Sequence, residues 1–236
     1  MHGNLPALEA AVADAKARGV EQFFCAGDIV GYGPFPDDVC EYLQQCNIRA
    51  ITGNYDRKVL LVLSQGPSAV NPLQKKKQKV LLWTAAHIQE KSQKYLESLP
   101  ERLELAFPGP NKVLVVHGSP IDNDEDIYPS ITDIALKAKM GEARCDTLVC
   151  GHTHIPFVKR VGGVLVVNCG STGQPVDGDT RVSYALIEFG DGNLAHAHIV
   201  RVQYEVAKVI DALRGTSLPK GLRKDFALGS KRIFLQ

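Results

Sequence analysis

Short apolar runs, each ending at a glycine or a polar residue, recur in the first two thirds of the chain. Four of them are rich in β-branched or aromatic residues and are short enough to be buried strands. They cover residues 21–26, 48–52, 112–116 and 147–150. Helical patterns lie between and around these runs, at residues 6–18, 36–45, 78–99 and 131–142.

The pattern changes after residue 154, where strand-like segments follow one another without helices between them. They cover residues 157–160, 164–168, 183–188 and 195–202, with turn residues Gly162-Gly163 and Asp191-Gly192-Asn193. Alternating strands and helices followed by hairpins predict an α/β fold of two packed mixed β-sheets flanked by helices. We expect one domain over residues 1–204 and a helical tail over 205–236, packed on the domain or on a partner.

The composition is consistent with one folded domain. A chain of 236 residues is long enough for a full hydrophobic core, and a net charge of +1 provides no broad basic surface for duplex nucleic acid. No apolar stretch reaches the roughly 20 residues that a membrane-spanning helix needs. The six cysteines contain no Cys-x-x-Cys pair, and we interpret Cys25, Cys150 and Cys169, which lie in or beside apolar runs, as buried free thiols of a reducing cytosol.

The four early strand ends carry residue types that bind metals. They are followed by Gly27-Asp28, Gly53-Asn54, His117-Gly118 and Gly151-His152-Thr153-His154, and His2 precedes the first helix. Each piece alone has a simpler interpretation as a turn dipeptide or a hydrogen-bonded structural histidine. Because ligands collect at the carboxyl ends of strands in α/β sheets, the set together predicts one cleft.

The set resembles the calcineurin-like metallophosphoesterase superfamily, in its small prokaryotic phosphodiesterase-like branch. That pattern reads Asp-x-His, Gly-Asp, Gly-Asn-His-Asp or Gly-Asn-Cys-Asp, His and Gly-His-x-His. This chain has His2, Gly27-Asp28, Gly53-Asn54-Tyr55-Asp56, His117 and Gly151-His152-Thr153-His154 in the same order, and the resemblance covers residues 2–189.

The resemblance implies two divalent ions about 3.5–4 Å apart and a hydroxide between them that attacks phosphorus. By the family pattern, the first ion takes His2, Asp28 and His154. The second ion takes Asp28, Asn54, His117 and His152, with Asp28 as the bridge. Mixed nitrogen and oxygen ligands suit Mn, Fe, Ni or Zn, and the sequence does not choose among them.

Two positions depart from the family pattern. The family places an aspartate two residues before the equivalent of His2, at the end of a first β-strand. The chain as given begins at Met1 and contains neither, so we expect unpaired strand edges and a weakened first metal site. Either the start is misplaced or trimmed, or this is a natural short form.

The second departure is Tyr55, which stands where the family has His or Cys. The candidate catalytic residues are Asn54, Tyr55 and Asp56. Tyr55 either donates a hydrogen bond to a phosphate oxygen or packs beside the site. Asp56 is expected to hold the geometry of its loop rather than to take part in chemistry.

Two classes of function remain. The first is a metal-dependent phosphoesterase acting on phosphodiesters, or on phosphomonoesters, with a small phosphate ester or a nucleotide as its partner. The second is a catalytically weak or inactive metal-binding scaffold on the same fold that binds proteins. The five ligand-type residues at strand ends favour the enzyme, and the missing aspartate favours the scaffold. The surface loops at residues 31–36, 122–130 and 172–180 are expected to shape the pocket, and a homo-oligomer is compatible with the sequence.

Overall fold

The computed structural model describes residues 1–109, 111–190 and 195–230, and it has the predicted mixed α/β architecture. The helices are α1 (Leu5–Ala17), α2 (Pro36–Gln45), α3 (Asn54–Gln65), α4 (Lys75–His87), α5 (Glu90–Glu97), α6 (Asp133–Met140), α7 (Val206–Arg214) and α8 (Gly221–Leu228). The strands are β1 (Phe24–Cys25), β2 (Arg49–Ala50), β3 (Leu103–Phe107), β4 (Asn111–Val115), β5 (Thr147–Cys150), β6 (Phe157–Val161), β7 (Val164–Asn168), β8 (Val182–Phe189) and β9 (Ala195–Val202).

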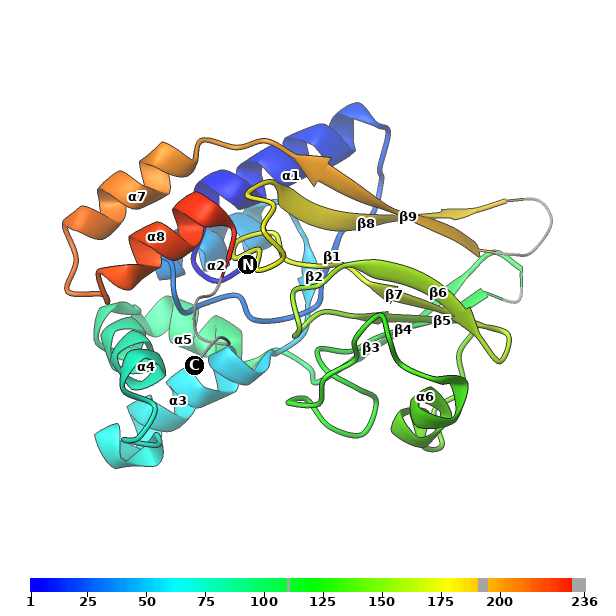
Figure 1. Ribbon diagram of the computed structural model, residues 1–236, viewed down its shortest axis with the longest axis horizontal. Coiled ribbons are helices and arrows are strands. Elements are labelled where there is room, and N and C mark those ends of the chain that lie inside the picture. Colours follow the sequence, from blue (N-terminus) through cyan, green and yellow to red (C-terminus); the bar gives the residue numbers. More distant parts are fainter. Residues whose placement is uncertain (110, 191–194, 231–236) are drawn as a thin grey trace.

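A five-stranded sheet forms one layer of the molecule. Its order is β3-β4-β5-β7-β6, with a parallel centre of β4, β5 and β7 and an antiparallel strand at each edge. The central strands are almost wholly apolar and buried, as expected for strands covered on both faces. Helix α6 packs on one face through Leu136 and Met140, and the hairpin β8–β9 packs on the other (Figure 1).

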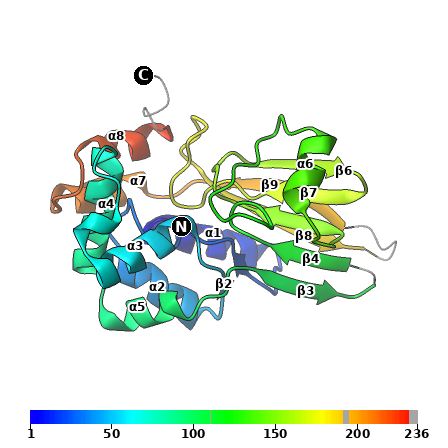
Figure 2. The same ribbon diagram turned by 90° about the horizontal axis from the view of Figure 1, so that it is seen from below.

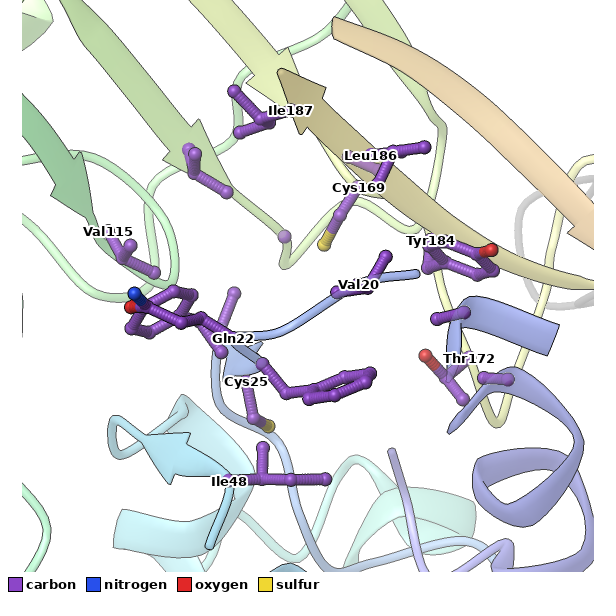
Figure 3. Close-up of a pocket in the computed structure, with 18 of the residues that line it drawn as sticks. Val20, Gln22, Cys25, Ile48, Val115, Cys169, Thr172, Tyr184, Leu186 and Ile187 are labelled. Carbon is purple, nitrogen blue, oxygen red and sulfur yellow. The ribbon is translucent and has the colours of Figure 1, made fainter. Parts of the chain in front are cut away.

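Two further sheets contain only two strands each. β1 pairs in parallel with β2, and β8 pairs with β9. A cavity of about 590 Å³ lies between them. Figure 3 shows its lining, with Val20 and Cys25 on one side and Leu186 and Ile187 on the other. Within the described residues, β1 and β8 each pair with one strand, and both line this cavity, in agreement with the expectation of unpaired strand edges. β1 covers only two residues of the predicted run over 21–26.

Helices α2 to α5, α7 and α8 gather at the end of the molecule away from the five-stranded sheet, and α1 extends from them toward the β8–β9 hairpin (Figure 2). Helices α1 to α5 share one core cluster, which includes Leu8, Leu43 and Val59. The C-terminal helices α7 and α8 belong to the same cluster through buried side chains, namely Val209, Leu213, Leu222 and Phe226. Lys76 of α4 and the buried Asp225 of α8 form an ion pair at 2.5 Å.

Several predicted elements differ from the observed ones. Helix α3 starts at Asn54, where the sequence pattern indicated a loop, because Gly53 is its N-cap and Asp56 accepts the Gly53 N–H at 2.8 Å. The segment predicted as one helix over 78–99 is two helices, because Ile88 and Gln89 between them have an extended backbone conformation. Strand β3 was not predicted. The predicted turn at 191–193 lies outside the described residues.

Within the described ranges, no helix is long and apolar enough to cross a membrane.

The packing of α8 yields a stability prediction. Phe226 is 1 % exposed, and Leu228 of the same helix is 44 % exposed. Phe226→Ala should lower the free energy of unfolding by about 3–5 kcal/mol, because it leaves a cavity in the shared core. Leu228→Ala is the matched control and should change it by less than about 1 kcal/mol. Urea unfolding measures both variants, and equal midpoints would show that α8 is not part of the core.

Candidate metal centre

The carboxylate of Asp28 lies at the centre of the predicted ligand residues. Asp28 follows β1 and is 3 % exposed. Its Oδ1 accepts the backbone N–H of Tyr55 at 2.8 Å. Its Oδ2 lies 3.3 Å from Nε2 of His2 and 3.4 Å from Nε2 of His117. One oxygen is therefore fixed by the backbone, and the other faces two imidazoles from opposite sides of the cluster.

His2, Asp28 and His154 form the first group. One donor atom of each lies within 4.8 Å of the other two, and all three residues are buried. The Nε2 atoms of His2 and His154 are 3.1 Å apart. The Nδ1 atoms donate to backbone carbonyls, at 3.2 Å to Val30 and 2.6 Å to Gln174. Since a carbonyl only accepts, each neutral ring carries its proton on Nδ1 and presents the Nε2 lone pair to the centre.

Asn54, His117 and His152 form the second group. Nε2 of His117 lies 3.3 Å from Oδ1 of Asn54 and 3.3 Å from Nδ1 of His152. Nδ1 of His117 donates to the carbonyl of Ala26 at 2.7 Å. His117 thus joins the end of β4 to the end of β1, and its inner nitrogen faces the other two donors. All six predicted ligand residues are brought together.

The geometry of these donors fits bound cations. When both rings are neutral and protonated on Nδ1, the Nε2 atoms of His2 and His154 carry lone pairs that face each other at 3.1 Å. Two lone pairs at this distance repel each other. When His117 is neutral as well, its Nε2 lone pair faces the carbonyl-type oxygen of Asn54 in the same way. A divalent cation among nitrogen and oxygen donors removes this repulsion and compensates the buried charge of Asp28.

The backbone at the site is strained. Positive φ angles occur at His2 (57°), Asp28 (53°), His152 (53°) and His154 (61°). Side chains other than glycine rarely adopt this left-handed region, at a cost of about 1–3 kcal/mol each. Four of the six predicted ligands share it, so the surrounding structure holds them in unfavourable conformations to aim their side chains inward.

The electrostatics of the site depend on its burial. Burial by itself raises the pKa of Asp28. When no cation is bound, protonated His117 and His2, together with the hydrogen bonds to His117 and Tyr55, hold that pKa well below its usual range. For His152, burial and the neighbouring His117 lower the pKa, which keeps its imidazole neutral and able to act as a ligand.

Asp56 stabilises the two loops that carry Asp28 and Asn54. Oδ1 of Asp56 accepts the backbone N–H groups of Ile29 and Val30 at 2.9 and 3.0 Å, and Oδ2 accepts that of Gly53. Burial and the charge of Asp28 raise the pKa of Asp56 to about 6. These contacts support the interpretation that Asp56 fixes loop geometry.

The Tyr55 hydroxyl contacts the Tyr32 hydroxyl, and the Tyr55 ring packs edge-on against His2 at 5.3 Å between ring centroids. Burial, followed by the neighbouring Tyr32, raises the pKa of Tyr55 far above its usual range. These contacts support the packing alternative for Tyr55. Sequence analysis did not single out Tyr32, which has positive φ and packs against His2.

The acidic loop after His117 also reaches the site, which the sequence suggested only in general terms. Asp124 accepts a hydrogen bond from Nδ2 of Asn54 and binds Lys58 at 3.0 Å. Asp126 lies 3.4 Å from Nε2 of His152. The signal available in the sequence was the high density of carboxylates at residues 122–126. The cavity described above also reaches Asp28, His117, His152 and His154.

A layered α/β fold that brings imidazole, amide and carboxylate donors together at its strand ends is an arrangement that can hold divalent metal ions. The chain belongs to the calcineurin-like phosphoesterase superfamily, whose domain model matches residues 1–192.

Three relatives illustrate the similarity. The chain is 32 % identical to the uncharacterized protein MJ0912 of Methanocaldococcus jannaschii, over 97 % of this chain and 95 % of that protein. The crystal structure of a metallophosphoesterase from Sphaerobacter thermophilus is 32 % identical, with a TM-score of 0.75 over 97 % of this chain and 96 % of that one. The hypothetical protein PH1004 of Pyrococcus horikoshii OT3 is 26 % identical, with a TM-score of 0.85 over 98 % and 96 %. The family, and the α/β fold, are therefore as predicted.

The tight packing at Gly53 yields a second prediction. A Cβ atom at Gly53 would lie 2.1 Å from the backbone nitrogen of Asp28 and 2.4 Å from its Oδ1. Gly53→Ala should therefore displace Asp28 and weaken Mn²⁺ binding by at least about 10-fold. Gly215→Ala, where the nearest atom is 3.6 Å away, is the control. Isothermal titration with MnCl₂ gives both affinities, and equal values would contradict the central position of Asp28.

Proposed function

We propose that this protein is a metal-dependent phosphoesterase that hydrolyses phosphodiester bonds at a dinuclear metal centre. His2, Asp28 and His154 would hold the first ion. Asn54, His117 and His152, with Asp28 as the bridge, would hold the second. The observation that carries the proposal is the convergence of the other five side chains around the Asp28 carboxylate, each with a donor atom facing the centre.

Bound divalent ions would supply Lewis-acid polarisation of the phosphate and of the attacking water. The protein supplies the geometry. Asp56 fixes the two loops that carry Asp28 and Asn54, and the carbonyls of Val30, Ala26 and Gln174 fix the imidazoles. Since most donors are buried, the reacting atoms would be shielded from bulk water, which strengthens electrostatic stabilisation of the transition state.

The environment of Tyr55 supports a preference among substrates. Its hydroxyl is buried against Tyr32, and its raised pKa makes it a poor proton donor to a leaving oxygen. A site without a strong general acid at this position favours substrates whose leaving group needs little protonation. We therefore expect higher activity toward activated phosphodiesters than toward alkyl phosphomonoesters.

One observation favours the scaffold as a second candidate. The first group contributes three side chains, and its single carboxylate is shared with the second group. A site with so few anionic ligands binds a cation more weakly.

The other expectations stay predictions: Mn²⁺ among the usable metals, a small phosphate ester or nucleotide as substrate, a cytoplasmic location, and a domain boundary near residue 204.

Metal loading tests the proposal directly. The purified protein should bind a transition metal and hydrolyse bis-p-nitrophenyl phosphate with Mn²⁺ added. Asp28→Ala should abolish both, because it removes the shared carboxylate. Asp133→Ala, at an exposed carboxylate on α6, is the control and should change neither. Metal analysis that finds no ion, together with no turnover at saturating Mn²⁺, would reject the enzyme.

Tyr55→Phe separates the two roles of that residue. If Tyr55 packs beside the site, the variant should keep its metal content and a kcat within about 3-fold of the parent. A general acid would instead contribute about 10²–10⁴-fold. Steady-state kinetics with bis-p-nitrophenyl phosphate at saturating Mn²⁺ decide between the two, and a 100-fold loss of kcat would establish Tyr55 as a catalytic residue.

A further inference from the structure

We infer that Asp124 and Asp126, two residues of the loop after His117, are positioning residues that select the metal-binding atoms of Asn54 and His152. The inference rests on the proposed metal centre and adds two residues to it. It also assigns a role to the acidic loop, whose carboxylates would otherwise be solvated surface groups.

The loop is rigid enough to carry such a role. Ser119 accepts the backbone N–H of Asp122 at 3.1 Å, and Asp122 accepts that of Asp124 at 2.9 Å. Nδ2 of Asn123 donates to the carbonyl of Thr52 at 3.0 Å, which ties the loop to the segment that carries Asn54. At the far end of the loop, Ile127 is 1 % exposed and anchors it in the core.

Asp124 determines which end of the Asn54 side chain faces the centre. An amide nitrogen only donates and cannot bind a cation, whereas the amide oxygen can. Asp124 accepts a hydrogen bond from Nδ2 of Asn54, so Oδ1 turns toward Nε2 of His117 at 3.3 Å. Lys58 binds both oxygens of Asp124, at 3.0 and 3.2 Å, and thereby holds the carboxylate in place.

Asp126 lies beside the outer nitrogen of His152, as Asp124 lies beside the amide nitrogen of Asn54. Oδ1 of Asp126 lies 3.4 Å from Nε2 of His152, while Nδ1 of His152 lies 3.3 Å from Nε2 of His117. A carboxylate beside Nε2 stabilises the proton there and leaves Nδ1 as the inner lone pair. Carboxylates and carbonyls that hold the outer N–H of a ligand histidine orient the ring and raise its basicity.

Side chains of this loop thus orient two ligands, whereas backbone carbonyls orient the other histidine ligands. His2, His117 and His154 are oriented by the backbone carbonyls of Val30, Ala26 and Gln174, respectively. Asn54 and His152 are oriented by side chains from one loop. Both belong to the second group, so the loop should control the second ion and leave the first nearly unaffected.

The test is a titration of the metal-free protein with MnCl₂ by calorimetry. Asp124→Ala and Asp126→Ala should each weaken the second binding event by about 10- to 100-fold and leave the first within about 3-fold. Asp124→Asn and Asp126→Asn keep an acceptor oxygen without the charge, so they should recover most of the affinity. Glu125→Ala is the control, because it removes a carboxylate of the same loop that pairs with Lys139.

The outcomes separate the inference from the proposed function. A parent protein that binds no Mn²⁺ would reject the metal centre itself. Two binding events in the parent, with unchanged affinity in both Ala variants, would overturn the inference alone. Equal losses in the Ala and Asn variants would also overturn it, since they would show that the loop acts only through its negative charge.

A spectroscopic readout checks orientation without metal. Nitrogen-15 chemical shifts of the metal-free protein should show His152 protonated on Nε2, and Asp126→Ala should increase the fraction protonated on Nδ1. An unchanged tautomer in Asp126→Ala would contradict the role of Asp126. Thermal unfolding of each variant identifies any that fails to fold, and the Asn variants then supply the comparison.

Discussion

The burial of one negative charge organises this molecule. A carboxylate that is 3 % exposed is costly unless hydrogen bonds and opposite charges surround it, and Asp28 has both. The backbone of Tyr55 satisfies one oxygen, and imidazoles from residue 2 and residue 117 approach the other. Segments distant in sequence meet here because each contributes part of this compensation. A bound cation would compensate the same charge more strongly.

Short connections keep the donors in these positions. The four ligands with positive φ lie in tight turns directly after strands or before a helix, where extended backbone could not aim their side chains inward. Asp56 stabilises two such turns at once through three backbone N–H groups. The five-stranded sheet and the helical layer support these turns, and four of the residues that face the centre have strained backbone.

Much of the fold followed from local pattern. Helix α2 and strand β7 match their predicted bounds, because Pro36 starts the helix and a glycine pair precedes the apolar strand. The six ligands could be predicted because their residue types repeat at strand ends. The start of helix α3 could not be predicted, because a glycine N-cap followed by a ligand residue resembles a turn in the sequence. The roles of Asp124 and Asp126 depend on distances across the fold, and carboxylates in a polar loop carry no distinctive pattern. The left-handed backbone of the histidine ligands is likewise imposed by the tertiary structure, so it could not be predicted from the sequence.

The separation of the two-stranded sheets has a consequence for cohesion. Among the described residues, no backbone ladder joins β1 to β8, and a cavity of about 590 Å³ lies between them. The donors nevertheless come from both sides of this gap, from His2 to His154. Ions held there would cross-link His2 to His154 and so close a loop of about 150 residues. The entropic cost of closing a loop grows only with the logarithm of its length. Metal loading would then determine how firmly the two halves of the domain stay together, in addition to any chemistry at the site.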